Sequence, residues 1–161
     1  MKTFLLSVVA LMAWLHCAEG FGADQSLVIK RAVNTAESTA SEISAAELNL
    51  TGMRNSLGSS ESQVVSAILS EAALLVAKAS PIVLTGDVYA KMKDKDDRAT
   101  VLRFFRFAAR AYTKQVAISL PWINSCLTQI TTPAALAEAT AVRDKMLEAR
   151  ASTQQFDDEG T

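Results

Sequence analysis

Between Asp24 and Ser80 the chain contains no proline, and its apolar residues recur at spacings of three and four. This spacing places the apolar side chains on one side of an α-helix, where they can pack against a neighbouring helix. A chain with this pattern must fold mainly by packing helix on helix. The first apolar stripe predicts one long helix and consists of Ile29, Ala32, Ala36, Ile43, Ala46, Leu50, Met53 and Leu57, with Thr39 in its one polar position.

A second helix follows after a short turn. Gly52 and Gly58 weaken the end of the first helix, and a Gly/Ser turn joins it to the second. Ser60 and Gln63 have the spacing of a capping box, so we expect the second helix to begin there. Its apolar stripe stops before Pro81 and consists of Val64, Val65, Ile68, Leu69, Ala72, Leu75, Val76 and Ala79.

Proline and acidic residues divide the rest of the chain. Acidic residues at 94, 96 and 97 favour a helix start, and Pro121 is expected to end or kink that helix. The pattern from residue 82 to residue 92 fits either a brief strand or a short helix. The further predicted elements are a helix from about Arg98 to Leu120, a short helix over 122–130, and a last helix that begins with Thr132 as its cap and Pro133 in its first turn.

The start of the chain has the features of a secretory signal peptide. Lys2 precedes an apolar run over residues 4–15, and Ala18 and Gly20 are the small residues that a signal peptidase reads. A run of about a dozen residues is too short to span a bilayer, which needs roughly 20. We therefore expect residues 1–20 to be removed and the protein to be periplasmic or secreted.

The predicted organisation is one all-α domain. With 50% hydrophobic residues and few glycines and prolines, residues 21–151 are expected to form a compact bundle of four to five helices. Residues 152–161 are expected to form a flexible acidic tail, because they are too polar to pack.

Few residues with catalytic or metal-binding chemistry lie outside the predicted signal peptide. His16 and Cys17 fall within it, which leaves Cys126 as the one remaining cysteine and no histidine. This composition excludes Ser-His-Asp and Cys-His catalysis, histidine-bearing zinc sites and thiolate clusters. The sequence therefore predicts no enzyme, no metal and no cofactor. Cys126 is interpreted as a buried small hydrophobic residue, with an intermolecular disulfide as the alternative.

The predicted partner-binding site is a basic helix face. Residues 91–114 carry 8 basic and 3 acidic side chains, whereas the net charge of the whole chain is −1. Arg103, Arg106, Arg110 and Lys114 are spaced three and four apart, so they share one side of a helix, and Phe107 borders them. An aromatic residue beside arginines is typical of binding hot spots. The alternatives are that Phe107 packs under a neighbouring helix or stacks with an arginine, and that the basic face is merely solvated.

Three binding functions follow from these residues. The first is a non-enzymatic exported protein, of adaptor, chaperone or inhibitor type, which binds an acidic protein surface through the basic face as a monomer or homodimer. The second is a carrier of an amphiphilic small molecule in a pocket lined by Phe104, Phe105, Tyr112 and Trp122. The third is a secreted amphipathic protein that unfolds its bundle onto a membrane and exposes its apolar helix faces to lipid. Anionic lipid or an amphiphile is the alternative partner of the basic face. Nucleic acid is not expected, because nucleic-acid-binding domains are usually basic overall.

One short motif suggests a modification. Asn49, Leu50 and Thr51 match the acceptor pattern for N-glycosylation. Leu50 also belongs to the first apolar stripe, so the same three residues have an ordinary structural reading.

Overall fold

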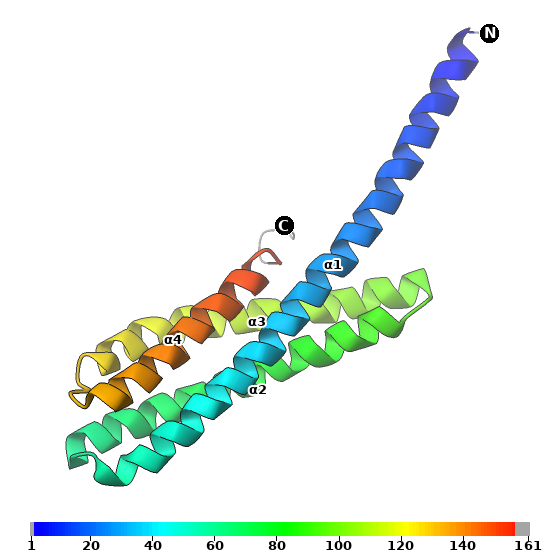
Figure 1. Ribbon diagram of the computed structural model, residues 1–161. Helices are drawn as coiled ribbons and strands as arrows, with labels where there is room; N and C mark the ends of the chain where they lie inside the picture. The colour runs from blue at the N-terminus through cyan, green and yellow to red at the C-terminus, as the bar shows by residue number, and fades with distance from the viewer. Residues whose placement is uncertain (1, 157–161) are drawn as a thin grey trace.

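The computed structural model describes the backbone of residues 2–156 and the side chains of residues 25–156. Within that part of the chain there are four α-helices and no strand, which confirms the predicted all-α bundle (Figure 1). The predicted signal peptide coincides with the first part of α1, whose side chains lie outside the described residues. The elements are α1 (Lys2–Met53), the short 3-10 helix η1 (Arg54–Ser56), α2 (Ser59–Lys91), α3 (Lys95–Leu127) and α4 (Pro133–Gln154).

The four helices pack as a closed ring. α1 packs against α2 and α4, and α3 packs against the same two helices, whereas α2 and α4 barely meet across the core. Short connections make consecutive helices run in opposite directions (Figure 1). The side formed by α2 and α3 is therefore opposite the side formed by α1 and α4.

Apolar stripes of the predicted kind fill the centre of this ring. Every member of the first stripe from Ile29 to Leu50, Thr39 included, is buried, while Met53 and Leu57 at its end are half-buried. Cys126 is buried as expected, and burial raises the pKa of its thiol.

The helix end predicted at Pro81 is wrong, and so is the separate short helix predicted after Pro121. Pro81 lies inside α2 and Pro121 lies inside α3, so the segment 82–91 is helical and α3 continues to Leu127 without a separate short helix. A proline inside a helix leaves the carbonyl four residues earlier without its usual donor. Those carbonyls belong to Ala77 and Ala117, and both these residues and the prolines are exposed. The long helices therefore keep their prolines on the outside of the bundle.

The starts of α2 and α3 also differ from expectation. Gly58 is the cap residue of α2, and no side chain caps this end, so the predicted capping box of Ser60 and Gln63 is wrong. At α3, Asp94 is the cap, and its Oδ1 accepts hydrogen bonds from the backbone N–H groups of residues 96 and 97 at 2.8 and 3.1 Å. This cap starts α3 three residues before the predicted boundary.

The start of α4 is confirmed, but its cap comes from another helix. Thr132 is the cap residue and Pro133 occupies the first turn, yet the hydroxyl of Thr132 makes no capping bond. Glu61 of α2 instead accepts the backbone N–H groups of Thr131 and Thr132 at 2.9 and 2.7 Å and the Thr132 hydroxyl at 3.0 Å. These bonds, led by the Thr132 N–H, lower the pKa of Glu61. One carboxylate thus joins the start of α2 to the start of α4.

Replacing Glu61 by glutamine is expected to destabilise the protein at neutral pH. Glutamine keeps the size but removes the negative charge at the start of α4, where the helix dipole favours an anion. Because folding lowers the pKa of Glu61, its stabilising effect is present above the ordinary value of 4.5 and is lost as the pH falls through the lower folded value. Urea unfolding of wild type and E61Q from neutral to acidic pH should therefore show a gap between their midpoints that narrows on acidification. As a control, Q63A changes an exposed residue of the same turn and should match wild type; a constant E61Q gap would contradict the linkage.

The end of α4 corrects the predicted flexible tail. The helix runs to Gln154, and both Thr153 and Phe156 are buried. The Thr153 hydroxyl lies 2.8 Å from that of Thr113, and the Phe156 ring meets the Phe105 ring edge to face with centroids 5.0 Å apart. The expectation that the chain stops packing at residue 152 is therefore wrong as far as Phe156, and residues 157–161 lie outside the described residues.

Candidate docking face on helix α3

The structure separates the predicted basic face into two parts. Arg103, Phe107 and Lys114 are exposed, whereas Arg106 and Arg110 are half-buried. The exposed fraction of Phe107 is 74%, so the interpretation that it packs under a neighbouring helix is wrong.

Arg110 has a structural contact that the sequence did not suggest. Its Nε donates a hydrogen bond of 3.1 Å to the backbone oxygen of Phe156, and this bond ties α3 to the end of the described chain. Arg103 and Lys114, by contrast, form no ion pair with any of the residues 25–156. These two cations are the ones that remain directed to solvent.

The four predicted pocket aromatics do not share a cavity. Phe105 and Tyr112 are fully buried among the core side chains, and burial raises the pKa of Tyr112 to about 12. Phe104 and Trp122 are exposed instead. The predicted aromatic-lined pocket is therefore wrong, because its two halves belong to the core and to the surface.

The exposed aromatics belong to an apolar stripe along α3. The exposed fractions are 62% for Phe104, 74% for Phe107, 71% for Ile118 and 43% for Trp122. At 100° per residue these four side chains fall within about 60° of one another, and they extend over about 27 Å of helix. Ile118 was not among the predicted site residues, although its spacing of four from Trp122 indicates that the two side chains share one side of the helix. We use the term outer face of α3 for the six exposed residues Arg103, Phe104, Phe107, Lys114, Ile118 and Trp122.

A shallow hollow lies at one end of this face. It has a volume of about 440 Å³ and opens broadly to solvent beside Phe104 and Phe107, with Thr100 and Arg103 at its border. It brings together three residues of the outer face of α3.

The neighbouring helix α2 extends the apolar surface. Its exposed residues on the outside of the bundle include Ala73, Leu74, Ala77, Pro81 and Leu84. Among the described residues, α2 is the one helix long and apolar enough to cross a membrane by length and composition, a property that core helices of soluble proteins can share. Leu69, Val76 and Val83 of α2 are half-buried against the core, whereas Leu74 and Leu84 are exposed.

Carboxylates are few along α2 and α3, and two of them, Asp96 and Asp97, lie exposed in the first turn of α3. From Arg98 to Leu127, α3 contains no aspartate or glutamate. Of the three carboxylates of α2, Glu61 binds the start of α4, Glu71 accepts a hydrogen bond from Gln115 of α3 at 3.1 Å and one from Ser119, and Asp87 lines a cavity shared with α1.

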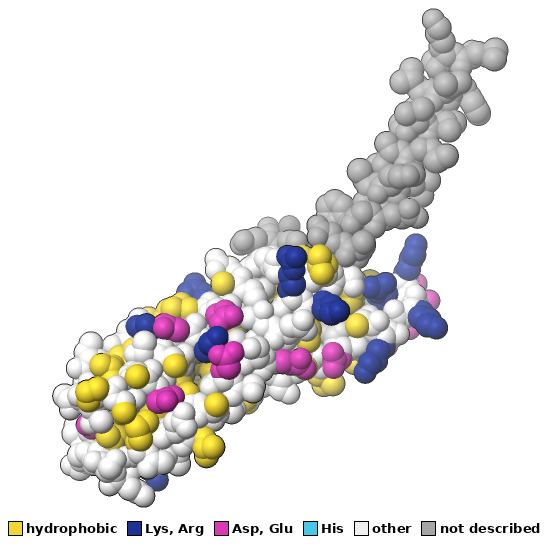
Figure 2. Space-filling model, in the orientation of Figure 1, with side chains coloured by type: hydrophobic (Ala, Val, Ile, Leu, Met, Phe, Trp, Pro, Cys, Tyr) yellow, Lys and Arg dark blue, Asp and Glu magenta, His cyan; other side chains and the backbone are white. Residues whose placement is uncertain are grey.

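The opposite side of the bundle, formed by α1 and α4, differs in its charged side chains. Figure 2 shows acidic and basic side chains mixed on this side. Lys145 of α4, for example, pairs with Glu42 of α1 at 2.7 Å and with Glu148 at 2.9 Å. The bundle therefore has a charge-balanced α1–α4 side and an apolar, cationic α2–α3 side.

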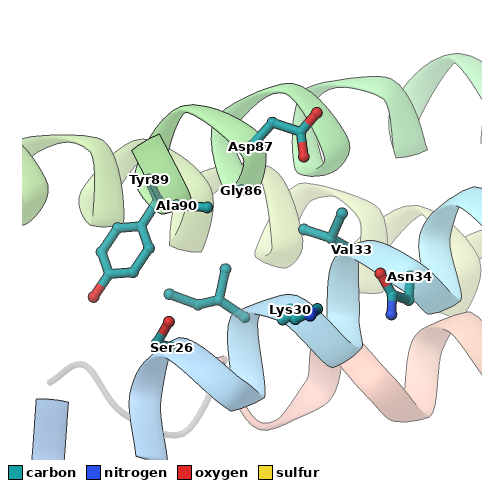
Figure 3. Close-up of a pocket in the computed structure, with 9 residues that line it drawn as sticks. Ser26, Lys30, Val33, Asn34, Gly86, Asp87, Tyr89 and Ala90 are labelled. Carbon is teal, nitrogen blue, oxygen red and sulfur yellow. The ribbon is translucent and has the colours of Figure 1, made fainter. Parts of the chain in front are cut away.

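A separate cavity of about 240 Å³ lies between α1 and α2. Ser26, Lys30 and Asn34 border it from α1, and Asp87 and Tyr89 border it from α2 (Figure 3). None of the residues predicted from the sequence as site residues reaches it. Among the described residues, no group of three or more histidine, cysteine or acidic side chains could hold a metal ion.

The glycosylation motif lies in the middle of helical structure. Asn49 is exposed on α1, and its Nδ2 donates a hydrogen bond of 3.1 Å to Glu138 of α4. The amide nitrogen that would carry a glycan is thus engaged with the neighbouring helix.

No protein family matches the chain, and neither the curated proteins nor the solved structures contain a significant match. Inference about function therefore rests on the exposed side chains described above.

Proposed function

We propose that the protein is a non-enzymatic docking protein that binds a negatively charged macromolecular surface through the outer face of α3. The observation that carries the proposal is the exposure of Phe104, Phe107, Ile118 and Trp122 beside Arg103 and Lys114. Contiguous large apolar side chains at the surface of a soluble domain mark an interaction site.

The charge of the face sets the sign of the partner. Arg103 and Lys114 have no carboxylate partner in the described chain, and α3 adds none beyond residue 98. A partner that supplies negative charge would pair with both cations while it covers the apolar side chains. An acidic protein surface and an anionic lipid surface both have this chemistry.

Carrier function receives less support. A carrier of an amphiphilic molecule needs an enclosed apolar cavity. Phe105 and Tyr112 are packed into the core, and the hollow beside Phe104 and Phe107 is open.

Site-specific photo-cross-linking in the source cells tests the proposal. A photoreactive phenylalanine analogue placed at Phe107 should give cross-linked adducts, whereas the same analogue at Leu48 should give few. Leu48 is an equally exposed residue beside the α1–α4 groove, on the opposite side of the bundle. Adding the charge reversals R103E and K114E should reduce the adducts at position 107 by about fivefold or more, because the electrostatic attraction is inverted.

The choice of residues keeps this test specific. Arg110 is left unchanged because it holds the backbone of Phe156 in place, and its loss would disturb the fold. Equal cross-linking at positions 48 and 107, or adducts at 107 that are unaffected by the charge reversals, would refute docking through this face.

A further inference from the structure

We propose that the negatively charged surface is that of a lipid bilayer, on which the α2–α3 side of the bundle lies flat. This inference rests on the proposed function and names its partner. It follows from the width of the apolar surface and the placement of the cations.

The apolar surface extends over two adjacent helices. On α3 the exposed stripe runs from Phe104 to Trp122, and on α2 it continues through Leu74, Pro81 and Leu84. α2 and α3 are packed side by side along the bundle. A bilayer is a broad apolar phase that meets both helices at once, and aromatic residues such as tryptophan favour its interfacial region.

The cations are placed for contact with lipid headgroups. Arg103 precedes Phe104 by one residue, and Lys114 lies between Phe107 and Ile118 along the same outer face of α3. Long lysine and arginine side chains can lay their apolar stems along a hydrophobic surface and direct the charged ends to headgroups. Of the carboxylates of α2, Glu61 is bound to the start of α4, and Glu71 accepts hydrogen bonds from Gln115 and Ser119 of α3.

Two protein occupants fit the surface less well. A second copy docked through the same face would bring Arg103 and Lys114 of both copies together, and α3 has no carboxylate from Arg98 to Leu127 to pair with them. An acidic protein partner would have to supply pockets for Phe104 and Phe107, which project outward, and also cover the exposed apolar residues of α2.

The test is quenching of Trp122 by lipid in the full-length chain. The vesicles contain phosphatidylcholine brominated in its acyl chains, with or without about 30 mol % phosphatidylglycerol. The signal is the difference in quenching between wild type and W122F, which removes any contribution from Trp14 of the N-terminal segment. We expect strong Trp122 quenching on the vesicles with phosphatidylglycerol and about tenfold weaker apparent binding without it.

Matched variants report which side of the bundle touches lipid. In the W122F background, L48W places a tryptophan on the opposite side, and this residue should not be quenched. R103E with K114E should abolish the preference for phosphatidylglycerol, and F104S with F107S should reduce Trp122 quenching about tenfold or more, since burial of apolar side chains drives interfacial binding. All six substitutions fall on exposed residues, and unchanged far-ultraviolet circular dichroism would show that the fold is intact.

The outcomes separate this inference from the proposed function. Absence of Trp122 quenching, or equal quenching at positions 48 and 122, overturns the bilayer as partner. If adducts of a protein then form at position 107 in cells, the docking function stands with an acidic protein as its partner. If position 107 gives no specific adducts either, both proposals are wrong.

Discussion

Replacing Phe105 by alanine is expected to lower the free energy of unfolding by about 3–5 kcal/mol. The same replacement at Phe104, the preceding residue, is expected to change it by less than about 0.5 kcal/mol. Phe105 is fully buried and packs edge to face on Phe156, so its removal leaves a cavity between α3 and the end of the chain. Phe104 is exposed, and alanine is also a better helix former.

Urea unfolding followed by circular dichroism measures both free energies. The pair also connects stability to function, because F104A should weaken binding to the partner while it leaves unfolding nearly unchanged. Similar losses of stability for the two variants would show that the assignment of Phe104 to the surface and Phe105 to the core is wrong.

Replacing Gly86 by alanine is expected to destabilise the protein by about 1–3 kcal/mol, although alanine normally stabilises a helix. A Cβ atom built on Gly86 would lie 2.1 Å from Cγ2 of Val33 on α1, which is well inside contact distance. Val33 is β-branched and cannot move its methyl group easily, because its χ1 torsion has one strongly preferred value in a helix. The absence of a side chain at Gly86 therefore allows α1 and α2 to approach closely at Val33.

The effect should reverse when Val33 is shortened. In a V33A background, G86A is expected to raise the free energy of unfolding by about 0.5–1 kcal/mol, the ordinary preference of a helix for alanine over glycine. A double-mutant cycle from urea unfolding of wild type, both single variants and the double variant measures this change of sign. If G86A is equally destabilising in both backgrounds, contact with Val33 is not its cause.

The helices themselves could be predicted from apolar spacing, but several of their ends could not. The stripe from Ile29 to Leu50 needs only the period of a helix, and it is buried as expected. Proline usually breaks or kinks a helix, so the sequence predicts a helix end before Pro81 and an end or kink at Pro121. Whether a proline is tolerated depends on whether the carbonyl that it leaves unpaired faces solvent, and only the packing of the bundle decides this.

The same limit applies to the candidate site. Periodicity placed Arg103, Phe107 and Lys114 on one exposed side of α3, and the structure agrees. It could not show that Arg110 binds the backbone of Phe156, because 46 residues separate them. The composition after residue 151 is mainly polar, so the sequence does not indicate that Phe156 packs. In the structure Phe156 is buried against Phe105, whereas the neighbouring Phe104 is exposed.

The contact between α1 and α4 also determines when this fold can be completed. These helices are the first and last of the described residues, so a nascent chain that ends before residue 133 has nothing to place on the sides of α1 and α3 that α4 covers. Such a chain would keep two apolar surfaces open throughout its synthesis, the condition in which incomplete chains aggregate or are held by chaperones. The ring therefore closes only after α4 has been synthesised.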